Sequence, residues 1–191
     1  MKNWRYIIIH HSATEDGQFL NDFAAIKRYH TAYRYNSRII TKEKAEQLMA
    51  EHKFVIKPCK DIGYHVVIEY DKNVLVEKQG RDLDTQGAHT TGLNGKAIGV
   101  CLVGDFDKKE PADEQYDLLV KAVLRLMKLC NIPLKNIRPH SYFASWKSCP
   151  GHKFNWTRFI IKITEVLKNG IEDGTTVSQP KLGQGNGQPN N

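Results

Sequence analysis

The sequence predicts an α/β domain, because short β-branched apolar runs alternate along the chain with longer stretches of helical period. Two further observations agree with a single such domain. The 191 residues are 40% hydrophobic, which is enough for one well-packed core. No run approaches the roughly 18 apolar residues that cross a bilayer, so we expect no membrane insertion.

The first expected element is a strand over residues 5–10. The run Tyr6-Ile7-Ile8-Ile9 is short, apolar and rich in β-branched residues, and it leads directly into His10 and His11. Successive side chains in a strand point to opposite faces, so His10 and His11 face different sides of the sheet. Only one of the two imidazoles can therefore easily serve a given site.

Two helices are expected next. Asn21 or Asp22 is a suitable N-cap for a helix through about Tyr35, which carries an apolar and aromatic stripe. Thr41 is a suitable N-cap for a second, strongly charged helix to about His52.

The middle of the chain changes to a period of two and predicts a β-hairpin. Apolar residues alternate over 64–70, residues 71–73 provide a turn, and 74–78 form the returning strand. Tyr64 would begin the first of these strands, where its side chain can project into a cleft. A further apolar strand is expected over 97–103.

The last third of the chain predicts two helices and a short strand. Residues 111–130 show the strongest helical periodicity, and 137–138 read as a short strand. Asn155 is a suitable N-cap for an amphipathic helix over 156–168, which we expect Asn169-Gly170 to end. Residues 171–191 are dominated by Gly, Gln, Asn and Pro and predict a disordered, low-complexity tail.

The net charge of +7 favours an anionic partner without identifying it. The basic residues are scattered rather than gathered in a stripe, and we find no nucleic-acid-binding module, so nucleic acid is not the expected partner. The four cysteines form no CxxC pair, and we expect no disulfides. Cys101 and Cys130 lie in apolar runs as small buried side chains.

Chemistry is expected at residues 139–151, an irregular segment rich in Pro, Ser and Gly that carries His140, Lys147 and Cys149. The strand that ends at His10 can deliver a second imidazole to the same place. Two histidines and one cysteine, with a fourth position open, are a ligand set suited to catalytic zinc. An incidental group of polar residues at loop ends is the alternative.

Four stretches in order, IIIHHSAT, GYHVVIEYD, GAHTTGLNGKAIGVCLVGDFD and RPHSYFASWKSCPG, resemble the zinc-dependent N-acetylmuramoyl-L-alanine amidases of the amidase-2 or peptidoglycan-recognition-protein type. The amidase-type lysozymes of bacteriophages are the most similar group. The resemblance implies a mixed central sheet flanked by helices, one Zn²⁺ per chain, and hydrolysis of the amide between N-acetylmuramic acid and L-alanine.

The resemblance also implies roles for individual residues. His10, His140 and Cys149 match the metal ligands, and Tyr64 and Lys147 match the catalytic residues. Residues two apart in an extended segment share a side, so Lys147 can face a substrate bound at the metal that Cys149 holds.

The groove for substrate is implied in the same way. The loop matching His89 and Thr90 lines the groove in proteins of this type, so these two residues and Asn94 are candidate substrate contacts. For His89 alone, solvation in an ordinary loop is the alternative. The expected partner is peptidoglycan, with its glycan strand and stem peptide.

The chain departs from compact phage amidases over residues 36–61, which read as an insertion into an amidase domain of residues 1–170. This segment contains the expected Thr41 helix. It can reshape the groove, bind a partner or have no function.

Several functional settings stay open. In the first, the protein is a monomeric phage or prophage endolysin, made in the host cytoplasm without an export signal and reaching the wall through a separately encoded pore. It can also be an intracellular amidase that recycles muropeptides, although recycling enzymes of this family carry an acidic residue where this chain has Cys149. A binding module without catalysis is a further alternative. Some phage amidases also restrain a phage RNA polymerase, which nothing in this sequence tests.

Overall fold

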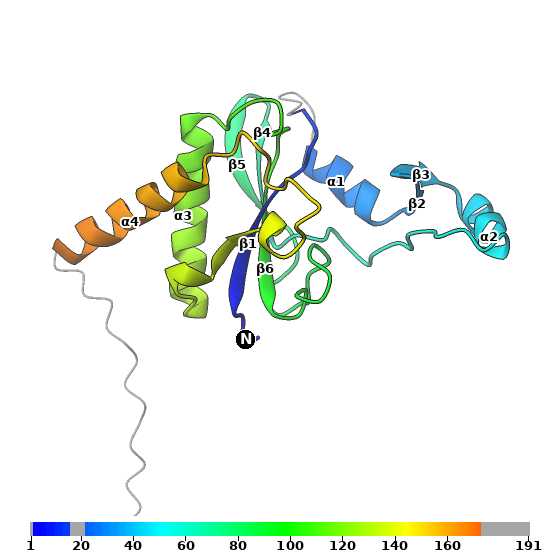
Figure 1. Ribbon diagram of the computed structural model, residues 1–191, viewed down its shortest axis with the longest axis horizontal. Helices are drawn as coiled ribbons and strands as arrows, with labels where there is room; N and C mark the ends of the chain where they lie inside the picture. The colour runs from blue at the N-terminus through cyan, green and yellow to red at the C-terminus, as the bar shows by residue number, and fades with distance from the viewer. Residues whose placement is uncertain (1, 16–21, 173–191) are drawn as a thin grey trace, which may run out of the picture.

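The apolar run near the start of the chain forms the strand on which the sheet is built. β1 (Tyr6–His11) pairs in parallel with β6 (Ala97–Leu102) on one side and with β7 (Ile137–Pro139) on the other. A computed structural model describes residues 2–15 and 22–172, and its main sheet has the order β5-β4-β6-β1-β7 (Figure 1).

The predicted hairpin is confirmed at the other edge of the sheet. β4 (Val66–Asp71) pairs in parallel with β6 and antiparallel with β5 (Val74–Gln79), so the sheet is mixed. Lys72 and Asn73 form the turn in left-handed conformations. The strand begins at Val66 rather than at Tyr64, although the Tyr64 carbonyl still accepts a hydrogen bond from the Arg81 amide (2.9 Å).

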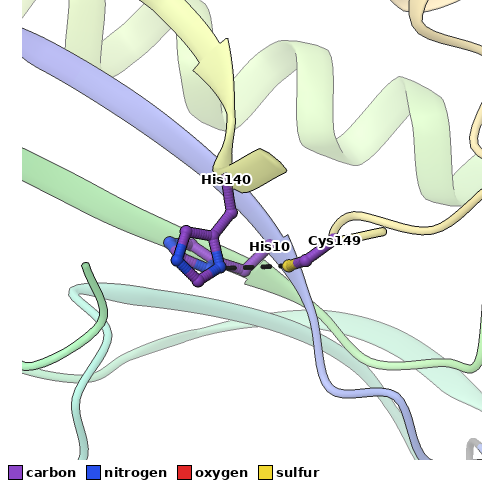
Figure 2. A group of neighbouring side chains, drawn as sticks. All are labelled: His10, His140 and Cys149. Atoms are coloured by element: carbon purple, nitrogen blue, oxygen red, sulfur yellow. Dashed lines mark hydrogen bonds between the residues drawn. The ribbon is translucent and has the colours of Figure 1, made fainter. Parts of the chain in front are cut away.

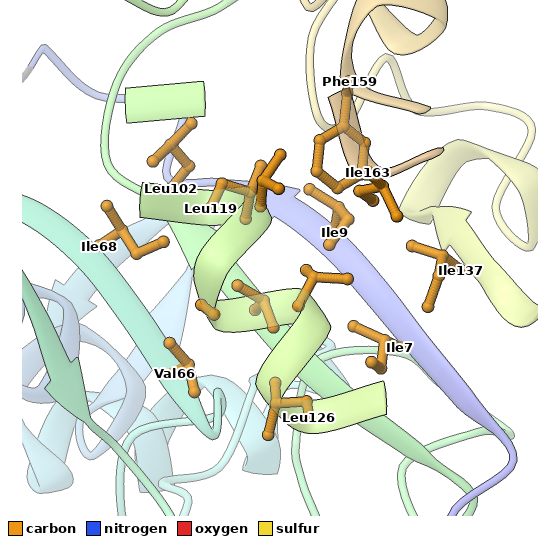
Figure 3. Close-up of a cluster of buried hydrophobic side chains, with 14 of the residues drawn as sticks. Ile7, Ile9, Val66, Ile68, Leu102, Leu119, Leu126, Ile137, Phe159 and Ile163 are labelled. Carbon is orange, nitrogen blue, oxygen red and sulfur yellow. The ribbon is translucent and has the colours of Figure 1, made fainter. Parts of the chain in front are cut away.

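Helices cover both faces, and the expected mixed sheet flanked by helices is confirmed. α3 (Asp113–Cys130) and α4 (Trp156–Glu172) cover one face and enclose the main core, to which β1 contributes Ile7 and Ile9 (Figure 3). α1 (Asp22–His30) lies on the other face, with Val67 and Cys101 beneath it. A short 3₁₀ turn, η1 (Leu134–Asn136), precedes β7.

The first predicted helix is wrong in its length. It ends at His30, and β2 (Tyr33–Tyr35) pairs with β3 (Arg38–Ile40) in a small hairpin. The two-residue turn has positive φ angles of 46° at Asn36 and 61° at Ser37, which match the twist of a tight hairpin. The aromatic side chains read as a helical stripe therefore belong in part to strands, where aromatics are favoured.

The Thr41 helix is confirmed as α2 (Lys42–Ala50), with the Thr41 side chain accepting a hydrogen bond from the Lys44 amide. It packs with the β2-β3 hairpin around a small apolar cluster that includes Ala45 and Leu48. This region extends away from the main sheet (Figure 1). The predicted insertion thus has a small core of its own.

Two smaller expectations need correction. Asn169-Gly170 does not end the last helix, which continues to Glu172, because one glycine costs a helix only about 1 kcal/mol. Cys130 is partly rather than fully buried, whereas Cys101 is buried as expected. The Asn155 cap is confirmed by a hydrogen bond from the Arg158 amide (3.0 Å). Of the predicted tail, residues 173–191 lie outside the described residues, as does the alternative cap Asn21.

The described residues include no helix with both the length and the apolar content needed to cross a membrane.

The main core predicts a difference between two leucines of α3. Leu119→Ala should lower the free energy of unfolding by about 2–5 kcal/mol, because Leu119 is fully buried and its loss leaves a cavity. Leu129, which is 50% exposed on the same helix, is the matched control, and Leu129→Ala should cost less than about 1 kcal/mol. Urea unfolding followed by tryptophan fluorescence measures both, and equal losses would contradict this packing.

Candidate metal centre and active site

Two parallel strands deliver the histidines of the predicted ligand set. His10 lies near the end of β1, on the sheet face that α1 covers, and His140 begins η2 (His140–Tyr142) directly after β7. Because Ile9 is paired with Pro139 in the parallel register, the residues that follow them, His10 and His140, lie next to each other, with ring centroids 4.4 Å apart. Cys149 reaches them from the loop that follows η2 (Figure 2).

The three donor atoms converge as a metal site requires. One donor atom each from His10, His140 and Cys149 lies within 4.8 Å of the other two, and all three residues are buried. The Nδ1 atom of His10 is 3.7 Å from the Cys149 sulfur. Tetrahedral zinc with its usual bond lengths places nitrogen and sulfur ligands about 3.6 Å apart, so the donors fit that ion. Three protein donors are typical of catalytic zinc and four of structural zinc.

The sulfur of Cys149 is held from several sides. The backbone amide of His11 donates a hydrogen bond to it (3.4 Å). The Asp107 carboxylate accepts hydrogen bonds from the Ser148 hydroxyl (2.8 Å) and the His152 amide (2.9 Å), which flank the cysteine. Asp107 thereby fixes both ends of the segment that carries the thiol.

Gly151 lets this segment approach the neighbouring turn closely. Its φ angle is +114°, and a Cβ atom there would lie 2.4 Å from the carbonyl carbon of Phe106. Any larger residue would therefore displace the loop that carries Cys149.

His11 lies on the opposite strand face, as the alternation predicts. Its Nδ1 atom accepts a hydrogen bond from the Phe106 amide (3.3 Å), and one of its ring nitrogens lies within 4.8 Å of a carboxylate oxygen of Asp105 and of Asp107. Asp105 is paired with Lys108, and Asp107 holds the Cys149 loop. We therefore assign this second group a structural role.

Burial keeps the donors neutral in the absence of a cation. Burial, together with the nearby Lys147 charge, lowers the pKa of His140 to about 4. Burial raises the pKa of Cys149 to about 12, although the His11 amide and Lys147 oppose that shift. Binding of a divalent cation would therefore release the thiol proton, as is usual when a cysteine becomes a ligand.

The two predicted catalytic residues adjoin this group. Lys147 is exposed in a turn closed by a hydrogen bond from its amide to the Ala144 carbonyl (2.9 Å). The pKa of His10 is lowered mainly by its own burial and by the neighbouring histidines, and the charge of Lys147 adds to this effect. The ring of Tyr64 lies 5.1 Å from that of His10. Burial raises the pKa of Tyr64 well above its usual value, so the phenol stays protonated at neutral pH.

The three predicted substrate contacts already have partners within the chain. The Asn94 side-chain oxygen accepts hydrogen bonds from the amides of His89 (2.7 Å) and Thr90 (2.8 Å). Thr90 is only 3% exposed, and the His89 ring lies against His10. Their contact with substrate stays a prediction.

Sequence reasoning missed the residues that support the ligands. Asp107 is 41 positions from Ser148, and no local pattern connects the two. Asp107 ends the GDFD stretch, in which nothing local marks its carboxylate as a support of the cysteine loop. The His11 amide was equally invisible, because a backbone contact leaves no signal in residue type.

An α/β domain with a candidate three-donor metal centre at the carboxyl ends of two parallel strands is the class of protein that this fold and site define. The chain belongs to the N-acetylmuramoyl-L-alanine amidase family, whose model matches residues 1–152.

Curated relatives match over part of their length. The endolysin of Klebsiella phage KP32 is 47% identical over 49 residues, which are 26% of this chain and 30% of the endolysin. Peptidoglycan-recognition protein SC2 of Drosophila melanogaster is 30% identical over 97 residues, or 50% of each chain. The chain thus spans no more than about half the length of these relatives.

Solved structures with the same fold are similar over most of their length. The amidase LysC of Clostridium intestinale has a TM-score of 0.57 at 21% identity, covering 85% of this chain and 87% of that one. Bumblebee peptidoglycan-recognition protein SA has a TM-score of 0.56 at 21% identity, with 82% and 83% covered. At such identities the likeness concerns the fold.

Buried histidines outside the ligand set predict a pH-dependent stability. His65 is 1% exposed, and its Nδ1 atom accepts a hydrogen bond from the Gly99 amide (3.0 Å). Burial lowers its pKa to about 4, whereas an unfolded histidine has a pKa near 6.5. The unfolded chain therefore binds this proton more tightly, and the stability from neutral His65 is complete above pH 6.5 and is lost towards pH 4.

The wild-type free energy of unfolding should fall between pH 7 and pH 5. In His65→Asn this fall should be smaller by about 2 kcal/mol. Urea unfolding at both pH values, with a chelator present, measures this loss. The exposed His152 is the control, and His152→Asn should behave as the wild type does. The same loss in the His65 variant and the wild type would reject the assignment.

Proposed function

We propose that this protein is a zinc-dependent hydrolase that cleaves the amide between N-acetylmuramic acid and L-alanine in peptidoglycan. The observation that carries the proposal is the convergence of His10, His140 and Cys149 beside the charge of Lys147. Membership of the amidase family supports it. The catalytic domain would span residues 1–170, with residues 36–61 as an insertion.

An amide has a weakly electrophilic carbonyl carbon and a poor leaving group. Zinc held by the three donors would supply Lewis acidity, which lowers the pKa of water to about 7 and polarises the substrate carbonyl. A single thiolate among the ligands leaves a formal charge of about +1 at the site.

Lys147 would stabilise the negative charge that grows on the carbonyl oxygen during attack. Its side chain is exposed, and its charge contributes to lowering the pKa of His140, which supports a role for the ammonium group beside the donors. Such a donor contributes about 3 kcal/mol in comparable sites.

Tyr64 would orient the attacking water. Its phenol stays protonated at neutral pH, so it can donate one hydrogen bond and accept another. The raised pKa argues against Tyr64 acting as a phenolate base, because the phenolate form is scarce at neutral pH. Tyr64 therefore contributes by positioning and by hydrogen bonding in the transition state.

The endolysin relatives favour lysis of a bacterial wall as the setting. In that setting the protein would be made in the host cytoplasm and would reach peptidoglycan through a pore encoded separately. The net charge of +7 would assist binding to carboxylates of the stem peptides.

Two variants separate metal binding from catalysis. Cys149→Ala should abolish both tight zinc binding and release of stem peptides from peptidoglycan, because one of three ligands is lost. Cys130→Ala is the control, since that thiol is partly buried in α3. Lys147→Ala should keep zinc and lower release by at least about 100-fold.

Lys153→Ala removes an exposed charge from the same loop and should leave release nearly unchanged. Zinc content by mass spectrometry and soluble peptides by chromatography measure these effects. Full release by both the Cys149 and the Lys147 variants would reject the mechanism.

A second experiment tests the lytic setting. Turnover of polymeric sacculi should exceed that of soluble anhydromuropeptides when equal amounts of cleavable amide are supplied. The comparison measures the rate of new amino termini for each substrate. A strong preference for the soluble fragments would replace lysis by recycling of wall fragments.

A further inference from the structure

His89 lies behind His10 and contacts it directly. The Nδ1 atom of His89 is 3.0 Å from the Nε2 atom of His10, on the side of that ring away from Cys149. The Nε2 atom of His89 is 3.1 Å from the carbonyl oxygen of Ala97, the first residue of β6. Both ring nitrogens of His89 thus have partners, and each partner constrains where protons lie.

The carbonyl oxygen decides the tautomer of His89. A carbonyl oxygen only accepts hydrogen bonds, so the Nε2 atom of His89 must carry a proton. Among the described residues no carboxylate is hydrogen-bonded to the His89 ring, and its Nδ1 atom faces only the His10 ring and the Thr90 hydroxyl, so the neutral ring has a free lone pair on Nδ1. This Nδ1 atom can therefore only accept a hydrogen bond.

The tautomer of His10 follows from that of His89. If the Nε2 atom of His10 also lacked a proton, two lone pairs would face each other across 3.0 Å. The Thr90 hydroxyl can donate one hydrogen, but it is 3.0 Å from His89 and 3.5 Å from His10 and cannot serve both. A proton on the Nε2 atom of His10 resolves this conflict.

The Nδ1 atom of His10 is then left bare, and it is this atom that faces the Cys149 sulfur at 3.7 Å. A metal ion needs that lone pair, because a protonated nitrogen cannot be a ligand. We propose that His89 is a positioning residue that holds His10 in the tautomer whose Nδ1 atom is ready to bind the metal. The inference rests on the proposed metal site and adds a role for a residue expected only to contact substrate.

The space around His89 is shaped for this ring. A Cβ atom at Gly99 would lie 2.6 Å from the Cγ and Cδ2 atoms of His89. A Cβ atom at Gly87 would lie 2.5 Å from its Cδ2 atom. Two glycines from separate segments thus leave room for the imidazole, and the Asn94 side chain fixes the backbone of His89.

A neutral acceptor behind His10 also suits the charge of the site. Partners of this kind orient a metal-binding histidine and tune its basicity. A carboxylate in the same place would add a negative charge next to the thiolate ligand, whereas an imidazole adds none. The site would therefore keep its formal charge of about +1 and with it the Lewis acidity that amide hydrolysis needs.

The test uses the full-length chain in metal-free form, with histidine rings labelled with ¹⁵N. Long-range proton–nitrogen correlation spectra report which nitrogen of each ring carries a proton, and a His10→Gln variant assigns the signals of His10. We expect wild-type His10 to be protonated at Nε2 and bare at Nδ1. His89→Ala should populate both tautomers, and chelator competition should show zinc affinity reduced by about 10- to 100-fold.

His89→Asn is the conservative variant, because its side-chain oxygen can accept the hydrogen bond near the position of Nδ1. It should restore the Nε2 proton of His10 and most of the zinc affinity. Circular dichroism would establish that each variant is folded before it is compared.

Two results would overturn the inference: a wild-type His10 protonated at Nδ1, or a folded His89→Ala variant that keeps both the single tautomer and the wild-type zinc affinity. A wild-type protein that binds no zinc would reject the proposed function instead. The metal-free spectra of His10 would still decide the role of His89 in that case.

Discussion

The parallel pairing of β1 with β7 is the constraint on which the candidate site depends. Its register pairs Ile9 with Pro139, so the residues that follow them, His10 and His140, lie side by side. A slip of one residue would turn His10 to the opposite face and bring His11 in its place. The apolar residues before His10 prevent such a slip, because Ile7 and Ile9 are fully buried under α3 and α4. The main core thereby sets the geometry of the donors.

The remaining supports of the site come from neighbouring strands and turns rather than from the loop that carries Cys149. β6 provides the Ala97 carbonyl that holds His89, and the turn after β6 provides Asp107, which fixes the residues on either side of Cys149. Each of the two ligands His10 and Cys149 is therefore oriented by a second residue that is itself hydrogen-bonded to the chain. This arrangement anchors the donors to rigid elements of the fold, which a precise metal site requires.

The sequence alone predicted much of this fold and the identity of the donors, for identifiable physical reasons. Alternation along a strand separated His10 from His11, and helix caps such as Thr41 and Asn155 have local signals that the structure confirms. The errors arose where the same residues suit two structures, as with Tyr33, whose spacing continued a helical stripe although it lies in a hairpin. Asp107 and the position of His89 were not predictable, because their roles come from contacts between segments distant along the chain.

The identity of the metal ligands is tested most directly by X-ray absorption spectroscopy at the zinc edge of the zinc-loaded protein. The structure predicts one sulfur neighbour at about 2.3 Å together with nitrogen or oxygen neighbours at about 2.0–2.1 Å. The sulfur contribution should disappear in the Cys149→Ser variant, if that variant retains metal. A first shell without sulfur in the wild type, or one with two or more sulfur atoms, would contradict the site formed by His10, His140 and Cys149.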